Sequence, residues 1–581
     1  MQTSSAPTAR KPRSKLPQSF WVANTMEIFE RLAWYGFFAV STLYITGSRA
    51  EGALGFTSEQ RGMLQGIVPF ILYLLPVVFG ALGDRFGYKK TFFVAYTLMV
   101  PAYYLLGQFT AFGTFFMAFL FVAVGAAIFK PVVVGTVART TDETNSSMGF
   151  GIFYMMVNIG GFVGPIVAGI VRVRYGWDWV FIASAFWIAC NFIWLLLFYK
   201  EPTTEAGSAD KRSLKQVFSG IVEVLGNGRF FLLVFFILAL LAISGRDISW
   251  TQMLLIAGTW IVLNLLLDIP LRARAKTNSG GAWFMQPLKL GNWKFALYLL
   301  ILSGFWTSFN QIFLTMPEFI RDYVDTSDMV ETARNWVGDD FAREFAAVNE
   351  DLLSNEIITF AAEHKTEAAG AVALSQETVT KFKRTLLDFK VRVPETDIRS
   401  SISSLSTDTA SAKALAHTWA EKYRQVNPEY IINIDAGAIV VFQVLVSFLI
   451  GFFPPLSVMV IGILVSAVGI GMSAWLSTGW LVTLAITIFA FGEMIASPKS
   501  QEYVGRIAPQ QKVAMYMGFY FWTIALGNIF GGRLSGELYG SLARDAGRPD
   551  LMWMIFGGLA LLTALLLVLY DKLILKKGNP E

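Results

Sequence analysis

The chain has 581 residues, of which 54% are hydrophobic and only 15% are charged, so it is too apolar to be a soluble globular protein. Its net charge of +5 comes from basic residues in loops between apolar segments, which is typical of membrane topology, and we expect no nucleic-acid partner. A single cysteine, Cys190, leaves no disulfide framework and no Cys-based metal or redox motif.

Long apolar windows dominate the chain. A membrane-spanning helix needs about 20 apolar residues, and about fourteen windows of this kind occur. We therefore expect an all-α membrane protein. In chain order the windows cover residues 19–47, 60–83, 89–108, 112–137, 146–175, 177–198, 229–245, 249–270, 292–320, 432–453, 455–476, 478–505, 511–540 and 550–573.

The windows fall into groups of six, two and six. Polar linkers flank the middle pair at 229–270, with KEPTTEAGSADKRS before it and RARAKTNSGG after it. Two six-helix halves resemble the major facilitator fold, in which substrate binds near the membrane midplane between halves that rock against each other. The predicted divisions are a basic tail at 1–18, a six-helix bundle at 19–200, linkers and the extra pair at 201–291, one span of the second bundle at 292–321, an insert at 322–428, the rest of that bundle at 429–575 and a tail at 576–581.

Lysine and arginine positions indicate the orientation. Clusters of them precede the first window and follow the second, sixth and eighth, whereas alternate connections such as GQFTAFG carry none. Because cytoplasmic loops are enriched in Lys and Arg, we expect both termini on the cytoplasmic side of a plasma membrane, the inner membrane of a bacterium. Arg172, Arg174 and Arg544 fall on the opposite side and are a minority.

The insert at 322–428 departs from this plan. It is polar and Ala-rich, as in SAKALAHTWAEKYRQ, and its Leu, Phe, Ile and Val positions recur with a helical period. By the count of connections it lies outside the cytoplasm, where we expect a small helical domain whose partner is unknown. His364 and His417 both lie in this segment and are interpreted as surface residues.

Three charged residues interrupt the first window, in the stretch NTMEIFERLAWYGFF. Glu27, Glu30 and Arg31 are spaced i, i+3 and i+4, so they lie on one helix face and can pair locally. Each ionised side chain near the centre of a spanning helix costs on the order of 2.5–3.5 kcal/mol, so the three residues must face the protein interior. A buried salt bridge that only fixes helix packing is the alternative to a functional site.

Two further charges are expected at a similar depth. With a rise of about 1.5 Å per residue, Lys130 in the window 112–137 and Glu493 in the window 478–505 both fall near the level of Glu27. A layer with separated positive and negative groups suits a zwitterionic ligand and titratable carriers. Other polar or aromatic residues either line a cavity or pack and hydrogen-bond between helices, and both readings stay open for Asn158, Asn310, Gln311, Asn433, Asp435, Asn528, Tyr35, Tyr73 and Trp306.

The segment EIFERLAWYG resembles the ExxER signature of the proton-dependent oligopeptide transporters, a branch of the major facilitator superfamily. Further motifs of that family resemble GALGDRFGYKK at 80–90, IFKPVVVGTVA around Lys130, FYMMVNIGG around Asn158, GEMIASP at 492–498 and MGFYFWTIALGNIFGG. The extra pair of helices between the halves also resembles the bacterial members. The motifs cover both halves of the chain, and their order and spacing match the family.

The resemblance implies import of di- and tripeptides driven by inward proton flow, with peptides, protons and the lipid bilayer as partners and no cofactor. Glu27 and Glu30 would couple protonation to the state of Arg31 and Lys130, and Asp84 and Arg85 would hold the cytoplasmic gate. The residues implied to bind the peptide are Arg31, Tyr35, Tyr73, Lys130, Asn158, Asn310, Gln311, Glu493 and Ser497.

Several positions depart from the family pattern. Many members have a titratable Glu where this chain has Asn310, so the route or number of coupled protons differs. Lys499 and Glu502 follow Glu493 where bacterial relatives usually carry neutral residues, and Gly66 stands where animal members have a His. The extracytoplasmic insert is also placed differently from that of animal members.

Two other functions stay open. A carrier of another small anion or zwitterion, such as nitrate or a peptide-like drug, would share the scaffold, because a fold does not determine the substrate. A peptide receptor or scaffold that recruits a partner through the insert would explain the non-titratable Asn310. An enzyme is the weakest reading, because the sequence shows no catalytic, metal-ligand or phosphate-loop constellation.

Overall fold

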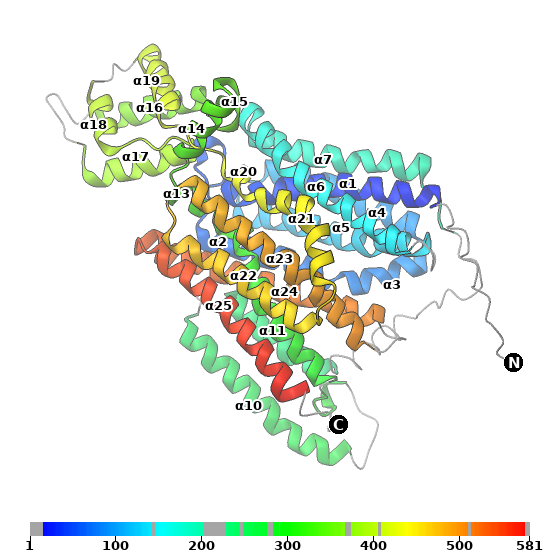
Figure 1. The fold of residues 1–581 in the computed structure, drawn as a ribbon. Coiled ribbons are helices and arrows are strands. Elements are labelled where there is room, and N and C mark those ends of the chain that lie inside the picture. The colour runs from blue at the N-terminus through cyan, green and yellow to red at the C-terminus, as the bar shows by residue number, and fades with distance from the viewer. Residues whose placement is uncertain are drawn as a thin grey trace.

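The computed structural model describes residues 16–141, 146–202, 227–243, 248–275, 283–289, 291–365, 374–404, 408–508 and 513–575. Within these ranges the regular structure is helical, and extended pairing takes the form of isolated bridges, such as Asp325 with Thr478 and Val391 with Arg424. Long helices run side by side, and a group of shorter helices lies at one end of them (Figure 1). The predicted all-α class is confirmed.

Up to Ile193, the described residues of the first half form seven α-helices. The predicted window 60–83 contains two of them, because Pro76 lacks a backbone N–H and bends the chain at Leu75. Leu75 keeps a helical conformation, so the junction is a kink and not a loop. The helices are α1 (Gln18–Thr46), α2 (Ser58–Leu74), α3 (Pro76–Phe86), α4 (Tyr88–Gln108), α5 (Phe112–Arg139), α6 (Ser146–Tyr175) and α7 (Trp177–Ile193).

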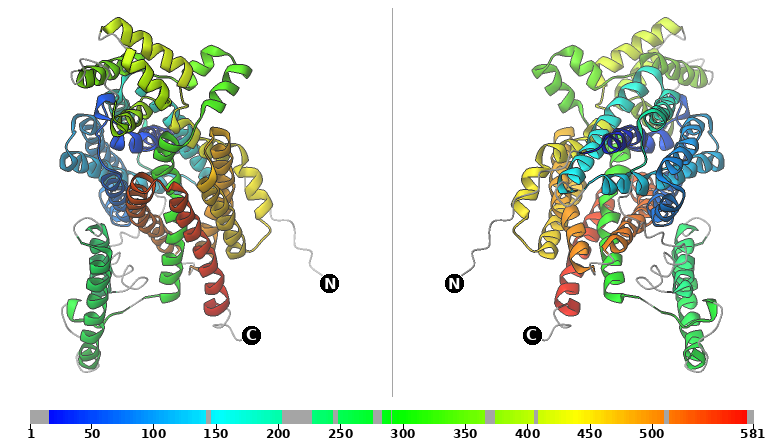
Figure 2. Two further views of the ribbon diagram at one scale, coloured as in Figure 1. Left: turned by 90° about the vertical axis from the view of Figure 1, so that its left-hand side faces the viewer. Right: turned by 90° about the vertical axis from the view of Figure 1, so that its right-hand side faces the viewer.

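A helix pair, α9 (Gly228–Ile243) and α10 (Trp250–Ala275), follows the first half. Arg229 joins the two helices, because its guanidinium lies 3.0 Å from Asp268 Oδ1 and donates to the carbonyl oxygen of Asn264. Figure 2 shows the pair beside the other long helices and not among them. A ring contact between Phe231 of α9 and Trp522 joins the pair to the second half.

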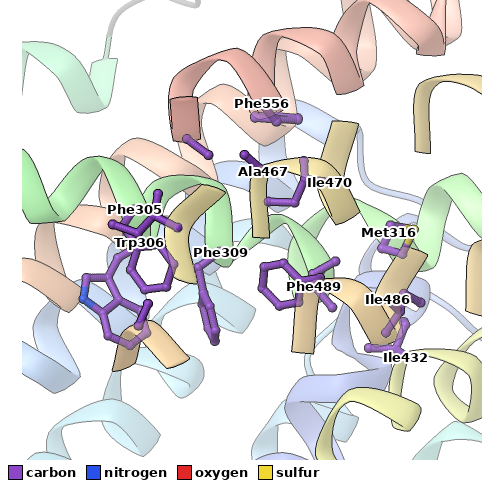
Figure 3. Packing of buried hydrophobic residues seen from close by; sticks show 14 of the residues in the cluster. Phe305, Trp306, Phe309, Met316, Ile432, Ala467, Ile470, Ile486, Phe489 and Phe556 are labelled. Carbon is purple, nitrogen blue, oxygen red and sulfur yellow. The ribbon is translucent and has the colours of Figure 1, made fainter. Parts of the chain in front are cut away.

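The second half surrounds a dense aromatic and aliphatic core (Figure 3). The rings of Phe309 and Phe489 lie 5.4 Å apart between its first helix and the helix that carries Glu493. The predicted window 292–320 is interrupted at Asn310 and Thr315. The helices are α11 (Trp293–Phe309), α12 (Gln311–Leu314), α13 (Met316–Tyr323), α20 (Pro428–Ile432), α21 (Ile434–Ile450), α22 (Pro455–Met472), α23 (Gly479–Ile507), α24 (Val513–Leu538) and α25 (Pro549–Tyr570).

Within the described ranges, nine helical stretches are long and apolar enough to cross a membrane. They coincide with nine of the predicted windows. The remaining five windows are also helical, as α1, α2 with α3, α4, α9 and α24. The charges inside α1 lower its hydropathy, and α9 has only 16 residues. The multi-pass membrane fold is therefore confirmed, whereas the full count of fourteen spans stays a prediction.

Glycines let the two halves approach each other closely where α2 crosses α24. A Cβ atom on Gly532 would lie only 2.5 Å from the Cα of Gly66, and a Cβ on Gly536 would lie 2.9 Å from the Cα of Glu59. Small residues allow this backbone-to-backbone packing inside membranes. A Cβ on Gly66 would in turn meet the Asn528 carbonyl oxygen at 3.3 Å, so a larger side chain such as His has little room there.

The insert between α13 and α20 consists of short helices with their own core. Leu353, Phe382 and Trp419 are among the buried residues of this core. The chain enters and leaves the insert at neighbouring points, since Thr326 N–H donates to Gln425 Oε1 at 2.6 Å. The helices are α14 (Ser327–Trp336), α15 (Asp339–Phe345), α16 (Glu350–Lys365), α17 (Gln376–Asp388), α18 (Glu395–Ser404) and α19 (Thr409–Tyr423).

Candidate functional site

One turn of α1 holds the three charged residues that interrupt the first window. Arg31 Nε lies 3.1 Å from Glu27 Oε1, and the guanidinium also pairs with Glu30. All three side chains are at most 4% exposed. Their i, i+3 and i+4 spacing turns the charges to one face, so local pairing offsets the cost of burial. Two ionised carboxylates on one guanidinium leave one excess negative charge.

Lys130 of α5 supplies a second cation next to this triad. Its Nζ lies 4.2 Å from the centre of the Tyr73 ring on α2, and it interacts electrostatically with Glu27 and Glu30. The Arg31 guanidinium lies 5.6 Å from the Tyr35 ring. Among the described residues, the Lys130 ammonium has no ion pair within 4 Å, so its charge is available to a bound anion. Three helices, α1, α2 and α5, thus gather six predicted residues into one cluster.

Glu493 of α23 lies in the second half, and its partner is Asp435 of α21. The two carboxyl groups interact electrostatically with each other. Tyr154 of α6 interacts electrostatically with Glu493, Asp435 and Tyr35. Tyr154 therefore stands between the cluster of the first half and the acid pair of the second half. The cations and this acid pair come from opposite halves, as a ligand with separated charges would require.

The other predicted binding residues form bonds within or between helices. Asn158 donates to the Tyr154 carbonyl oxygen at 2.8 Å. Gln311 is fully buried and donates to the carbonyl oxygens of Thr307 and Gly531, at 2.8 and 3.2 Å. The Ser497 carbonyl oxygen accepts from the Ser500 hydroxyl at 2.7 Å. The Nδ2 atom of the buried Asn310 has no hydrogen-bond partner among the described residues.

The predicted gating residues, Asp84 and Arg85, belong to α3 near its end. Their side chains lie outside the part of the structure that is described. Their assignment to the gate therefore stays a prediction.

Sequence reasoning missed a buried ion pair that joins the two halves near the insert. Arg61 Nε of α2 lies 3.1 Å from Glu318 Oε2 of α13, and both side chains are 0% exposed. Arg61 also donates to the Leu314 carbonyl oxygen at 2.6 Å. Glu318 accepts from Ser58 at 2.7 Å and pairs with Arg544 at 2.8 Å. Arg61 lies inside a predicted window, so the rule that singled out Glu27 would have found it. That rule is that an ionisable residue in an apolar window must face the protein interior.

A second ion pair between the halves involves Arg172 at the end of α6. Its Nη2 lies 2.6 Å from Glu429 Oε1 of α20 and 3.2 Å from Asn427 Oδ1. Its Nη1 lies 3.6 Å from Glu51, in the connection after α1. These contacts give a reason for basic residues on the side opposite to the Lys- and Arg-rich loops, because Arg172 and Arg544 each neutralise a buried carboxylate.

The insert contacts both halves at this end. Asp388 accepts from the Ser48 N–H at 2.9 Å and lies 3.1 Å from the Arg321 guanidinium of α13. Lys390 pairs with Glu51 and has a left-handed backbone, with φ of 59°. Burial raises the pKa of Asp388 to about 7, and this effect outweighs the opposing attraction of Arg321.

Hydrogen bonds and ion pairs join the described residues of the two halves at several successive positions, and these positions lie progressively closer to the insert. The innermost of them joins Asn433 to the Phe162 carbonyl oxygen at 2.9 Å. Thr42 then bonds to the Phe313 carbonyl oxygen at 3.2 Å, and the pairs of Arg61 and Arg172 lie beyond it. The halves are thus tied together at the end that carries the insert.

Comparison with known proteins agrees with this architecture. The chain is 26% identical over 174 residues to dipeptide and tripeptide permease A of Salmonella typhi, which is 29% of this chain and 34% of the permease. It is 29% identical over 161 residues to the peptide transporter YePEPT of Yersinia enterocolitica, which is 27% of this chain and 31% of that protein. The matches thus span about a third of the length of these curated relatives.

Solved structures show the same fold over nearly the whole chain. A POT family transporter in complex with 5-aminolevulinic acid superposes with a TM-score of 0.59 at 16% identity, covering 96% of this chain and 97% of that one. A POT family transporter in complex with a thioalcohol-conjugated peptide gives the same score and identity and covers 96% of each chain. At this identity the likeness shows the fold alone.

The sequence profile of the Major Facilitator Superfamily matches residues 27–258 and 430–580, more than half of the chain. The stretch it omits contains the insert. The prediction of a membrane transporter and not an enzyme is therefore confirmed, and the resemblance to oligopeptide transporters is confirmed as a distant homology. The chain belongs to the Major Facilitator Superfamily.

Proposed function

We propose that this protein imports di- and tripeptides together with protons by alternating access. The observation that carries the proposal is the placement of Lys130 beside the Arg31 triad in one half and of the Glu493 acid pair in the other. A peptide has a carboxylate at one end and an ammonium group at the other, so it matches this separation of charges. The distant homology to peptide permeases supports the same substrate class.

The chemistry of recognition follows from the charges. The peptide carboxylate would bind the Lys130 ammonium and the Arg31 guanidinium, since charge-assisted hydrogen bonds to a carboxylate are about twice as strong as neutral ones. The peptide ammonium would bind Glu493. The rings of Tyr35 and Tyr73, which already lie against the two cations, would line the peptide backbone.

Proton coupling would use the carboxylates of α1. Glu27 and Glu30 share Arg31 as their counterion. When the peptide carboxylate pairs with the Arg31 guanidinium, either Glu27 or Glu30 loses its counterion. A buried carboxylate without a counterion is costly in a medium of low dielectric constant, so it takes up a proton. Peptide binding and proton binding would thus support each other, which is the requirement for symport.

Alternating access would use the ties between the halves. In the present conformation the ion pairs of Arg61 and Arg172 hold the halves together at the insert end. The Lys and Arg distribution supports an extracytoplasmic insert and cytoplasmic termini in a plasma membrane, so this conformation would be closed toward the outside. In a conformation that is open toward the outside, these ion pairs would be broken and α2 would be separated from α24.

Reconstituted proteoliposomes test the proposal. An imposed inward pH gradient should drive accumulation of dialanine and trialanine in vesicles that contain the protein, and a proton ionophore should abolish it. A related structure holds 5-aminolevulinic acid, a zwitterion that is not a peptide, so this compound and nitrate complete the panel. Accumulation of nitrate without dialanine would favour an anion carrier, and binding without accumulation of any compound would favour a receptor.

A further inference from the structure

Two short helices of the insert, α14 and α15, expose large apolar side chains although their inner faces are packed. Met329 of α14 and Ala342 of α15 are buried in the core of the second half. At the turn between the helices Trp336 and Val337 are 86% and 65% exposed, and Phe341 of α15 is 47% exposed. Large apolar side chains that gather on a protein surface typically mark an interaction site. We call Trp336, Val337 and Phe341 the hairpin tip.

The turn that carries the hairpin tip is ordered by its own contacts. The amides of Val337 and Gly338 both donate to the Ala333 carbonyl oxygen, at 3.0 and 3.2 Å. Gly338 has a φ of 122°, a conformation that residues with a side chain rarely adopt, and the chain turns there from one helix into the next. Arg334 Nε lies 2.8 Å from Asp339 Oδ1 across the turn. The hairpin tip is therefore a defined part of the fold and not a frayed helix end.

Contacts with two membrane-spanning helices fix the level of this hairpin. Trp480, in the first turn of α23, donates from its backbone N–H to Asp328 Oδ2 at 3.1 Å and from its indole Nε1 to Thr332 Oγ1 at 3.0 Å. Arg174 Nη2, in the last turn of α6, lies 2.6 Å from Glu344 Oε1. Both α6 and α23 contain apolar stretches long enough to cross a membrane, and both contacts lie at their ends on the insert side. The hairpin thus lies where these helices leave the bilayer.

Exposed aromatic side chains at this level mark the boundary between lipid and water. They include Trp480 of α23, Tyr175 at the end of α6 and Trp179 in the first turn of α7. Trp and Tyr are enriched at membrane interfaces, because their rings are apolar and their polar ends can bind water. Thr332, which bonds to Trp480, precedes Trp336 by four residues, so these two residues lie on the same face of α14. The hairpin tip therefore continues the aromatic boundary of the membrane-spanning surface.

The hairpin stands beside the long helices, where lipid surrounds them. Figure 2 (left), seen from the side of Figure 1 that carries the insert, shows α14 and α15 standing out from the edge of the group of long helices. Residues 327–345 contain more acidic than basic residues. Anionic headgroups attract clusters of Lys and Arg, so they would not hold this hairpin. Its apolar side chains are the part that can bind a membrane.

We propose that α14 and α15 rest on the membrane surface at the insert end and that Trp336, Val337 and Phe341 enter the interfacial region of the bilayer. The lipid surface is then a partner of the insert. The contact depends on the membrane fold alone and is independent of the transported substrate. Because apolar side chains form it, it persists in uncharged lipid and at high salt, where attraction between exposed charges is screened.

Fluorescence quenching in nanodiscs that hold one copy of the full chain tests the contact. Cys190→Ala removes the single cysteine, and Trp336→Cys then carries the polarity-sensitive dye NBD. In phosphatidylcholine nanodiscs, lipids with a doxyl group should quench this dye strongly and aqueous iodide should quench it weakly, at low and at high salt. Lys413→Cys, at an exposed position of α19, is the matched control and should show the reverse pattern.

Thiol reactivity without a dye provides a second measurement, because a dye can itself partition into lipid. A charged, water-soluble maleimide should modify Trp336→Cys about tenfold more slowly than Lys413→Cys. Val337 and Phe341 still hold the tip in this variant, and burial of one apolar side chain is worth at least that factor. Adding Phe341→Asp should bring the two rates together at an unchanged midpoint of thermal unfolding.

Three results would overturn the proposal. Equal iodide quenching at the two positions would show that the hairpin tip lies in water. Protection of Trp336→Cys from both quenchers would show that protein covers the tip and lipid does not. Doxyl quenching that disappears at high salt would show that charges hold the hairpin at the membrane. The assays contain no substrate, so a failure of peptide transport would leave the lipid contact standing.

Discussion

Arg61 of α2 and Glu318 of α13 form an ion pair across the two halves, with Nε and Oε2 3.1 Å apart and both side chains fully buried. Arg61 also donates to the Leu314 carbonyl oxygen, and Glu318 also accepts from the Ser58 hydroxyl. Because each partner also bonds to a group of the opposite half, the pair holds the two halves together at the insert end.

Removing one partner of this pair should be strongly destabilising. Arg61→Ala leaves Glu318 with the partly exposed Arg544 and with a longer contact of 3.7 Å to Arg321, and breaking a buried pair typically costs about 3–5 kcal/mol. We expect the midpoint of thermal unfolding in detergent to fall clearly. Arg174→Ala is the matched control, because Arg174 and Glu344 are 56% and 51% exposed and such pairs contribute about 1 kcal/mol or less. Equal midpoints for the two variants would contradict the assigned role of Arg61.

Docking of the insert should depend on pH through Asp388. Its pKa in the docked state is raised to about 7, chiefly by burial, from an ordinary value of about 3.9. Docking therefore favours the protonated form: its contribution is complete below about pH 4 and is lost as the pH rises through about 7.

Hydrogen exchange at the Ser48 amide measures this dependence, since Ser48 N–H donates to Asp388. Protection, corrected for intrinsic exchange, should fall as the pH rises toward 7, and Asp388→Asn should remove the trend. Asp351→Asn, at an exposed position of the same insert, should leave the trend unchanged. A trend that persists in Asp388→Asn would show that another group titrates.

Replacing Glu30 should separate transport from proton coupling. Glu30 pairs with Arg31, and Gln cannot carry a proton in its place. We expect Glu30→Gln to abolish accumulation driven by a pH gradient while counterflow of labelled dialanine continues. Glu377→Gln, on an exposed helix of the insert, should accumulate peptide like the wild type. Undiminished accumulation by Glu30→Gln would show that the coupling proton is carried elsewhere.

Removing the ammonium of Lys130 should abolish recognition of the substrate carboxylate. The ammonium group contacts the Tyr73 ring and has no ion pair within 4 Å among the described residues. A bound carboxylate would therefore lose a main partner when this ammonium group is removed. We expect Lys130→Ala to lower dialanine uptake at least about tenfold, the weight of a hydrogen bond to a charged group. Lys381→Ala, exposed on α17, should be neutral. Uptake within twofold of the wild type would exclude Lys130 from the site.

Deleting the insert distinguishes a transporter from a receptor. A short linker can join Thr326 to Gln425, because these residues are already hydrogen-bonded to each other. We expect the shortened protein to retain most of its dialanine uptake. It should also open more readily at the insert end, because the contacts of Asp388 and Lys390 with the connection after α1 are removed. Loss of all uptake in a protein that still folds would favour a receptor or scaffold.

Several features could be predicted from the amino-acid sequence alone. The fourteen apolar windows are helices, and the charged turn of α1 has the pairing that its i, i+3 and i+4 spacing predicts. Both depend on neighbours within one helix, because hydropathy and helical periodicity are local properties of the chain. Lys130 could be singled out for a related reason, since an ionisable residue inside an apolar window must face the protein interior.

Only the tertiary structure decided which of these helices meet. Asp435 and Glu493, Arg61 and Glu318, and Arg172 and Glu429 are each separated by tens to hundreds of residues. Their meeting depends on close packing of helices, such as that of Gly66 on Gly532. Helices packed in lipid are selected by the fit of their surfaces and not by their hydropathy, so no local pattern in the chain specifies the partner of a buried charge.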